Sequence, residues 1–273
     1  MKITISNLAW EKKEDKEVIK LLKRYKVRGV EIAPTKIWKN PTKVSEKSIK
    51  KYRKFWEDNG IKIIATTSLL FGHPKLQIFS DNKTREKTLK YLAEVMRVTS
   101  ALGAKAMVFG SPKNRSTNGF SNQEVDKIAQ EFFYKVGKIA KKYKVYFGIE
   151  PNPPLYGTDF INSTKEAIDL VKLVGHPNFR IHLDTSTMEI NKEPYDKTLK
   201  EGLKYAKHFH ISEPGLKPIP QKGGVNHTRV SKMLRKLNYK GWLSIEMPLS
   251  PESDKLTQIS KTLDFVTSIY NLD

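Results

Sequence analysis

The stretch that decides the fold begins with Val145-Tyr-Phe-Gly-Ile-Glu150 and ends with Phe179-Arg-Ile-His-Leu-Asp184. Both segments are short, largely apolar runs closed by a carboxylate, which is a pattern of a buried strand. Between them, Ser163-Thr-Lys-Glu166 has the spacing of a capping box, and an amphipathic run follows it up to Gly175. A strand, a helix and a second buried strand in this order predict two parallel strands joined by a crossover helix.

The same unit repeats along all 273 residues. Strands are predicted at residues 2–5, 29–32, 61–65, 104–109, 145–149, 179–183, 208–211 and 243–245. A second capping box, Ser121-Asn-Gln-Glu124, and the pair Ser250-Pro251 mark the starts of two further helices. The segment after the first strand, Ser6-Asn-Leu-Ala-Trp10, contains no glycine, which disfavours an open nucleotide-binding sheet. We therefore predict an α/β protein with a single (β/α)8 TIM-barrel domain over residues 1–273.

The composition excludes several classes of protein. The chain has no cysteine, so disulfide scaffolds, cysteine zinc sites and thiol nucleophiles are ruled out. No run of about 18 apolar residues is present, and the start of the chain lacks an apolar signal core. We therefore expect a cytoplasmic protein with no membrane partner.

The net charge of +21 raises the question of an anionic partner. Only nine of the 50 basic residues are arginine, and the lysines are spread along the whole chain. Proteins that read nucleic acids favour arginine for bidentate contacts. A solvated, lysine-rich surface is therefore the favoured interpretation. The alternative is an anionic partner, either a phosphorylated small molecule or a nucleic acid, and nucleic acid is the less expected of the two.

Four consecutive predicted strands end in a side chain able to bind a metal ion: Glu150, Asp184, His210 and Glu246. The carboxyl ends of the strands form one rim of a TIM barrel, which is where its active sites lie. Three carboxylates on one rim repel each other unless a cation neutralises them, so we predict one divalent metal ion. The oxygen-rich donor set favours Mn²⁺, with Mg²⁺, Co²⁺ and Zn²⁺ as alternatives.

Six short motifs lie at or near the predicted strand ends: Gly29-Val-Glu-Ile-Ala-Pro34, Phe109-Gly-Ser-Pro-Lys-Asn-Arg115, Gly148-Ile-Glu-Pro-Asn152, His182-Leu-Asp-Thr185, His210-Ile-Ser-Glu213 and Ser244-Ile-Glu246. In these motifs the chain resembles the xylose isomerase-like TIM-barrel superfamily, and within it the sugar phosphate isomerase/epimerase group. The resemblance implies that Glu150, Asp184, His210 and Glu246 bind one divalent metal ion. It also implies that Glu150 and Glu246 are the catalytic acid/base pair.

The chain departs from two kinds of relative at identifiable positions. Ketose 3-epimerases have a histidine at the position of Thr187 and an arginine near Leu216-Lys217. Enzymes of the endonuclease IV type need further metal ligands, and those positions read Thr187, Thr66-Thr-Ser68, Phe109-Gly110 and Val225-Asn-His227. Only His227 is retained among them, so a three-zinc centre for DNA repair is not expected.

Seven residues are candidates for substrate binding: Lys113, Arg115, Asn152, His182, Glu213, His227 and Trp10. Lys113 and Arg115 follow the fourth strand, where they would hold a phosphate or form an ordinary basic loop. Glu213 either binds a substrate hydroxyl or supports a metal ligand. His182 and Trp10 either face the substrate or belong to the core.

The resemblance implies an enzyme that moves hydrogen next to a carbonyl group. A cation that holds the carbonyl and a neighbouring hydroxyl stabilises an enediolate, while a carboxylate removes the proton. We expect a metal-dependent isomerase or epimerase of a small sugar or sugar phosphate. A dehydratase of a keto-polyol is the alternative, with His182 or His227 as the acid, and an endonuclease IV-like or nucleic-acid-binding protein comes third. The choice between epimerisation and isomerisation, and the formation of a homo-oligomer, stay open.

Overall fold

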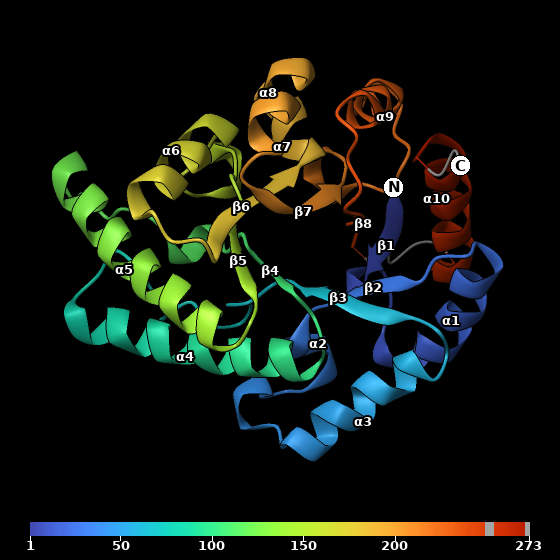
Figure 1. Ribbon diagram of the computed structural model, residues 1–273, viewed down its shortest axis with the longest axis horizontal. Coiled ribbons are helices and arrows are strands. Elements are labelled where there is room, and N and C mark those ends of the chain that lie inside the picture. Colours follow the sequence, from blue (N-terminus) through green and yellow to red (C-terminus); the bar gives the residue numbers. More distant parts are fainter. Residues whose placement is uncertain (249–253, 271–273) are drawn as a thin grey trace.

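Eight parallel strands form a closed barrel at the centre of the molecule (Figure 1). The computed structural model describes residues 1–248 and 254–270. The strands are β1 (Lys2–Ser6), β2 (Gly29–Ile32), β3 (Lys62–Thr66), β4 (Ala106–Phe109), β5 (Tyr146–Ile149), β6 (Phe179–Asp184), β7 (Ala206–Ile211) and β8 (Trp242–Ile245). Neighbours pair in sequence order, and β8 returns to β1 with Ile245 beside Ile5. The predicted (β/α)8 barrel is confirmed.

Helices surround this barrel on its outer side (Figure 1). Within the described residues they are α1 (Asp15–Arg24), α2 (Pro34–Ile37), α3 (Glu46–Glu57), α4 (Asn82–Ala101), α5 (Asn122–Lys142), α6 (Thr164–Val174), α7 (Thr185–Ile190), α8 (Tyr195–Gly202), α9 (His227–Lys236) and α10 (Lys255–Tyr270). Short 3₁₀ turns lie in the loops: η1 (Asn7–Ala9), η2 (Lys12–Glu14), η3 (Pro41–Lys43), η4 (Pro112–Asn114), η5 (Pro154–Tyr156) and η6 (Pro214–Leu216).

The predicted helix starts agree with the structure where it can be compared. Ser121 and Glu124 form a complete capping box at the start of α5. Ser163 caps α6 through the backbone N–H of Glu166, although the Glu166 carboxylate bonds elsewhere. The start predicted at Ser250-Pro251 lies outside the described residues.

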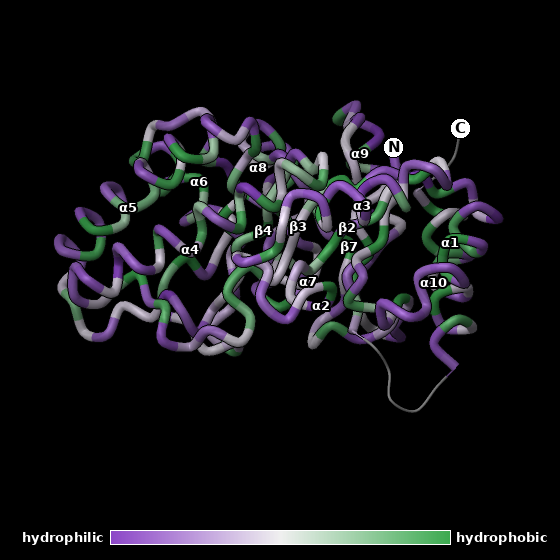
Figure 2. Tube along the Cα trace, turned by 90° about the horizontal axis from the view of Figure 1, so that it is seen from below, coloured by the Kyte–Doolittle hydropathy of each residue, from purple (hydrophilic) through white to green (hydrophobic). Residues whose placement is uncertain are grey.

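The hydrophobic core lies between the strands and the helices. Phe133 on α5, for example, packs against Phe147 on β5 and Phe179 on β6, with ring centroids 6.4 and 4.7 Å apart. Hydrophilic residues run along the outer sides of α4 and α5 (Figure 2). No helix in the described part of the chain is both long enough and apolar enough to cross a membrane.

The inside of the barrel carries polar side chains below the carboxyl-terminal rim. Glu31 on β2, His182 on β6 and His208 on β7 are all buried. Side chains two residues apart on a strand share a face, so His182 shares its face with Asp184, and His208 shares its face with His210. The strands therefore place a buried polar layer directly under the predicted metal ligands.

Candidate metal centre and substrate pocket

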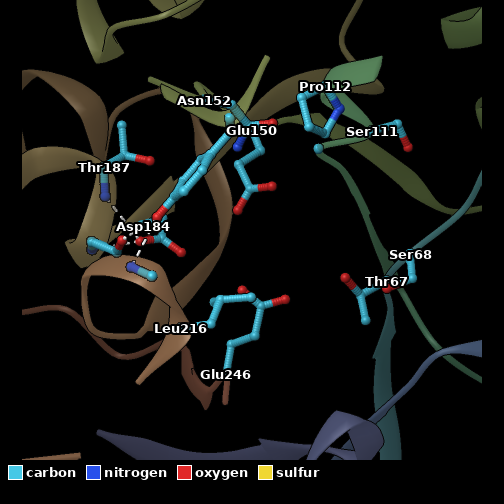
Figure 3. A pocket seen from close by; sticks show the side chains of 14 residues that line it. Thr67, Ser68, Ser111, Pro112, Glu150, Asn152, Asp184, Thr187, Leu216 and Glu246 are labelled. Carbon is cyan, nitrogen blue, oxygen red and sulfur yellow. Dashed lines mark hydrogen bonds between the residues drawn. The ribbon is translucent and has the colours of Figure 1, made fainter. Parts of the chain in front are cut away.

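A pocket of about 380 Å³ opens at the carboxyl ends of the strands. Its walls come from the segments that follow β3 to β8, so residues distant in sequence meet here. Glu150, Asp184 and Glu246 line it, and their carboxyl groups approach the same space from different sides (Figure 3). Three of the four predicted metal ligands therefore face one cavity.

The fourth predicted ligand, His210, lies close to all three carboxylates. Its Nδ1 is 3.2 Å from Oε2 of Glu246, 3.9 Å from Oδ2 of Asp184 and 4.0 Å from Oε1 of Glu150. The imidazole is fully buried, yet Nδ1 makes no well-aligned hydrogen bond. A buried nitrogen that makes no well-aligned hydrogen bond and lies among three carboxylates is a position where a cation would satisfy every group.

The spacing of these atoms fits a single divalent cation. Two atoms that are each about 2.1 Å from one cation lie roughly 3.0 to 4.2 Å apart. All three distances from Nδ1 of His210 fall within this range. Three carboxylates and one imidazole nitrogen suit Mn²⁺, Mg²⁺, Co²⁺ or Zn²⁺.

Hydrogen bonds orient the carboxylate of Asp184. Its Oδ1 accepts from the backbone N–H groups of Ser186 and Thr187 at 2.5 and 3.2 Å. The hydroxyl of Ser212 donates to the same oxygen at 2.7 Å. Because three donors occupy Oδ1, the other oxygen, Oδ2, is left to face His210 and the pocket.

The carboxylate of Glu150 lies against the backbone of Gly110. A Cβ atom at Gly110 would lie 2.3 Å from Oε2 of Glu150, so a larger residue at this position would displace the carboxylate. Asn152, two residues further along, also lines the pocket, and its buried Oδ1 has no hydrogen-bond partner. Asn152 therefore presents a polar group to the pocket, and its role in substrate binding stays a prediction.

His182 lies beside the predicted metal ligands and is absent from the described lining of the pocket. Its Nε2 is 3.7 Å from Oε1 of Glu150, and one ligand atom from each of Glu150, His182, Asp184 and His210 lies within 4.8 Å of the others. Burial and the charge of His210 lower the pKa of His182 well below its usual value, so the ring is neutral. The sequence offers His182 as a substrate-binding residue. The structure makes it a further candidate metal ligand, in addition to the four predicted ones.

Glu31 is absent from the residues that the sequence predicts for the site. It is fully buried on β2, and its Oε2 is 2.7 Å from Nε2 of His208 and 2.9 Å from Nε2 of His210. These are hydrogen-bond lengths, too short for two ligands of a shared cation. The contact holds Nε2 of His210 and turns Nδ1 toward the carboxylates. The sequence signal that could have identified Glu31 is its charge, because it lies within the otherwise apolar strand Gly29–Ile32.

Burial and mutual repulsion change the ionisation of the metal-free site. Burial raises the pKa of Glu150 to about 8, and the charges of Glu246 and Asp184 add to this. Burial and the charge of Glu246 raise the pKa of Asp184 to about 6. Burial opposes protonation of His210, but the charges of Glu31 and Glu246 outweigh it and raise its pKa. Without a cation, bound protons therefore neutralise part of the negative charge of the carboxylates.

The two basic residues of the loop after β4 are separated in the structure. Lys113 lines a neighbouring pocket and not the one that contains the carboxylates. Arg115 is fully buried, and its Nη2 donates to the carbonyl oxygen of Ile161 at 3.4 Å. Burial lowers the pKa of Arg115 to about 10, and the charge of Glu150 opposes this shift. The expected pairing of Lys113 and Arg115 around one anionic group is therefore not formed.

Trp10, Glu213 and His227 also lie outside the lining of this pocket. Trp10 is a core residue whose Nε1 donates to Asp15 at 2.8 Å. Glu213 is fully buried and accepts from two backbone N–H groups of the loop after β7. Nε2 of His227 is 3.2 Å from Glu213. The structure thus gives Trp10 a packing position, while Glu213 and His227 organise the loop.

Two positions that differ from the ketose 3-epimerases do line the pocket. Thr187 donates through Oγ1 to the carbonyl oxygen of Pro151 at 2.9 Å, which links the ends of β5 and β6. Leu216, beside Lys217, presents an apolar side chain to the pocket. The histidine and the arginine that the resemblance leads us to expect at these positions are therefore replaced by a threonine and a leucine in the pocket lining.

The chain belongs to the xylose isomerase-like TIM barrel family, whose model matches residues 19–269. The match covers most of the chain and confirms the resemblance read from the strand-end motifs.

Curated relatives include two kinds of enzyme. The D-psicose 3-epimerase of Ruminiclostridium cellulolyticum is 28% identical over 112 residues, which are 41% of this chain and 38% of that relative. The match thus spans well under two thirds of the epimerase. The inosose dehydratase of Mesomycoplasma hyopneumoniae is 26% identical over 203 residues, which are 62% of this chain and 66% of that relative.

Solved structures share the fold over nearly the whole chain. D-psicose 3-epimerase with D-tagatose from Clostridium cellulolyticum H10 matches with a TM-score of 0.82 and 18% identity, over 99% of both chains. The IOLI protein with a bound zinc atom matches with a TM-score of 0.75 and 18% identity, over 100% of both chains. At these identities the comparison shows the barrel architecture.

Proposed function

We propose that this protein is a divalent-metal-dependent epimerase or isomerase of sugars. One observation carries the proposal: Glu150, Asp184, Glu246 and Nδ1 of His210 converge at one pocket on the rim of the barrel. The similarity to D-psicose 3-epimerases and the zinc atom in a structural neighbour support the same reading.

In this proposal the chain's own carboxylates move the proton. When bound, a divalent cation would hold a carbonyl and a neighbouring hydroxyl of the sugar and stabilise the negative charge that develops there. Glu150 and Glu246 face the pocket from different sides (Figure 3). One of them removes the proton next to the carbonyl, leaving an enediolate, and the other returns a proton to the opposite face. Epimerisation needs two such groups, whereas isomerisation can use one.

Asp184 and His210 have a holding role in this scheme. Asp184 is fixed through Oδ1, and His210 is fixed through its contact with Glu31. Rigid ligands keep the substrate within reach of the two glutamates. We propose Mn²⁺ as the preferred metal, because the donor set is mainly oxygen, and Zn²⁺ as the main alternative.

The proposed reacting part of the substrate is uncharged. No lysine or arginine is among the described residues that line the pocket. Arg115 is buried, and Lys113 belongs to the neighbouring pocket. A phosphate close to the reacting carbons would lack the charged partners that such groups normally have, so the proposal favours a neutral sugar over a sugar phosphate.

A second candidate function is a metal-dependent dehydratase of a keto-polyol. The match to inosose dehydratase, over 203 residues, favours it. It would use the same removal of a proton next to a carbonyl, followed by loss of a hydroxyl group. His227 is bonded to Glu213 away from the pocket, so of the two histidines considered as the acid only His182 lies beside the site.

One experiment tests both candidates. The protein, loaded with Mn²⁺ in D₂O, is incubated with D-fructose, D-psicose, D-tagatose and a keto-inositol, and proton NMR follows the C–H next to the carbonyl. Either function predicts exchange of this proton for deuterium, and the product then separates an epimer from a dehydrated compound. Loss of exchange with a chelator and in Glu150→Gln is expected. If exchange appears with none of these compounds, or if it persists in Glu150→Gln, the proposal is wrong.

A further inference from the structure

The pocket at the carboxylates adjoins a second pocket of about 400 Å³. Ser68, Ser111 and Pro112 line both pockets, and they belong to the loops after β3 and β4. Figure 3 shows these three residues across the first pocket from Asp184. A ligand held at the carboxylates and long enough to pass these residues would occupy both spaces.

Hydrogen bonds hold the walls of the second pocket together. The side-chain amide of Asn114 donates to the carbonyl oxygens of His73 and Leu76 at 2.9 and 2.7 Å. The side-chain amide of Gln77 donates to the carbonyl oxygen of Lys113 at 3.0 Å. The loops after β3 and β4 are therefore joined at several points, and the pocket between them is preformed, as ligand sites usually are.

Two residues at the junction of the pockets have strained backbone. Ser68 has a φ of +56° and Ser111 a φ of +44°, in the left-handed region that favours glycine. Such conformations cost energy and concentrate at ligand-binding sites. The surrounding loops therefore hold the backbone of the shared wall in a fixed conformation.

The second pocket has an apolar wall with an exposed aromatic ring. Leu70 and Pro74 line it together with Phe71, whose side chain is 73% exposed. Lys113 is the one lysine or arginine among its described lining residues. A flat apolar group packs well on an aromatic face, whereas a phosphate needs several donors or cations.

We infer that the second pocket binds a second sugar ring, linked by a glycosidic bond to the sugar that reacts at the carboxylates. The C–H face of this ring packs on Phe71, and its hydroxyl groups lie near Ser68 and Ser111. The substrate class is then a ketose-containing disaccharide or oligosaccharide. This inference rests on the proposed function and adds the size of the substrate to it.

The second ring would also serve the reaction at the first. Binding energy from a remote part of a substrate helps to position the reacting part, so a truncated substrate loses turnover as well as affinity. A ketose disaccharide should therefore have a higher kcat/KM than the free ketose. The advantage should depend on Phe71, which lies outside the pocket of the carboxylates.

The test compares D-fructose with two glucosyl-fructoses, maltulose and isomaltulose, as substrates of the Mn²⁺-loaded protein. Deuterium exchange gives kcat/KM, and saturation-transfer NMR shows whether the glucosyl protons contact the protein without turnover. Phe71→Ala removes the aromatic face. Leu155→Ala is the matched control, because Leu155 is 77% exposed and is absent from the described lining of both pockets.

We expect kcat/KM for one of the disaccharides to exceed that for D-fructose by about tenfold or more. Phe71→Ala should remove this advantage and leave D-fructose unchanged, and Leu155→Ala should change neither. The saturation-transfer signal of the glucosyl protons should disappear in Phe71→Ala and persist in the wild type and in Leu155→Ala.

Other outcomes separate the inference from the proposed function. Equal kcat/KM for all three sugars, with Phe71→Ala without effect, overturns the inference and leaves the proposed function standing. D-fructose 6-phosphate and the variant Lys113→Ala are included in the same assay, and a preference for this phosphate that is lost in Lys113→Ala and kept in Phe71→Ala also overturns the inference. Saturation of the glucosyl protons that depends on Phe71, with no exchange of any sugar, supports the second site and contradicts the proposed function. The absence of both deuterium exchange and saturation of the glucosyl protons contradicts the inference and the proposed function together.

Discussion

Glu31 and His210 are 179 residues apart in the sequence, yet the Oε2 of Glu31 lies 2.9 Å from Nε2 of His210. The same oxygen is 2.7 Å from Nε2 of His208. Closure of the barrel brings β2 and β7 to face each other across its interior. One buried carboxylate thus sets the orientation of an imidazole whose other nitrogen faces three acidic side chains.

This contact predicts that Glu31 controls metal affinity without touching the metal. Glu31→Ala should weaken Mn²⁺ binding by about 10- to 100-fold, because His210 loses the group that orients it. Glu31→Gln keeps one acceptor and should weaken binding less. Titration calorimetry with Mn²⁺ measures both, and the exposed Glu131→Ala is the control. Wild-type affinity in Glu31→Ala would contradict this role.

The proposed acid/base pair predicts a loss of turnover without a loss of folding. Glu150→Gln and Glu246→Gln should each lower the rate of deuterium exchange by at least about 10²- to 10⁴-fold, since each removes a base and a metal ligand. Each also removes a carboxylate from a crowded, buried cluster, so the metal-free variants should melt no lower than the wild type. Retained exchange in both variants would exclude the pair.

The packing of Gly110 predicts a variant that acts through Glu150. In Gly110→Ala the new Cβ atom would lie 2.3 Å from Oε2 of Glu150, so the carboxylate must move. A misplacement of about 1 Å at a reacting group can cost about 100-fold in rate. We expect weaker Mn²⁺ binding and slower exchange with a nearly unchanged melting temperature. A crystal structure of the variant with Glu150 in its original position would refute the explanation.

The ionisation of the site predicts that metal binding strengthens as pH rises. The pKa of Glu150 is raised to about 8 and that of Asp184 to about 6, so protons compete with the cation below these values. The folded metal-free protein binds more protons than the unfolded chain in this window, so its stability falls as pH rises through it. The cation reverses that loss, because it binds only the folded state.

Thermal melts with Mn²⁺ and with a chelator measure this effect. The gap between the two melting temperatures should widen from about pH 5 to about pH 8.5. Glu150→Gln should reduce the pH dependence, because the group with the most strongly raised carboxyl pKa is gone. A gap that is constant over this range would count against proton competition at the site.

The missing histidines predict that the protein does not cleave DNA at abasic sites, despite its net charge of +21. Thr187 and Phe109 occupy places where an endonuclease IV-type enzyme needs ligands, and the retained His227 is bonded to Glu213. A gel assay with an abasic duplex and added Zn²⁺ checks this. Metal-dependent cleavage at the lesion, absent from an unmodified duplex, would show that the surface charge serves nucleic acid after all.

The barrel and the candidate ligands were accessible from the sequence because both depend on local pattern. An apolar run followed by a carboxylate or a histidine identifies a strand and its end without knowledge of its neighbours. Parallel strands place all such ends on one rim, so Glu150, Asp184, His210 and Glu246 were expected to converge, and they do.

The residues around the ligands could not be assigned in this way. The side-chain chemistry of Arg115 suits phosphate binding, and that of Trp10 suits packing against a sugar. Both side chains are nevertheless fully buried. Loops lack the fixed side-chain period of a strand, so a loop residue's orientation depends on what packs against it. For the same reason the sequence could not show that Lys113 lines a separate pocket.

What the sequence by itself determined is the eight-fold alternation and the chemical type of each strand end. Only the tertiary structure decided that Glu31 bonds to His208 and His210, that His182 joins the cluster of candidate ligands, and that a second pocket adjoins the first. The physical reason is that strand formation depends on neighbours in the chain, whereas a hydrogen bond across a barrel or a cavity between two loops depends on closure and packing.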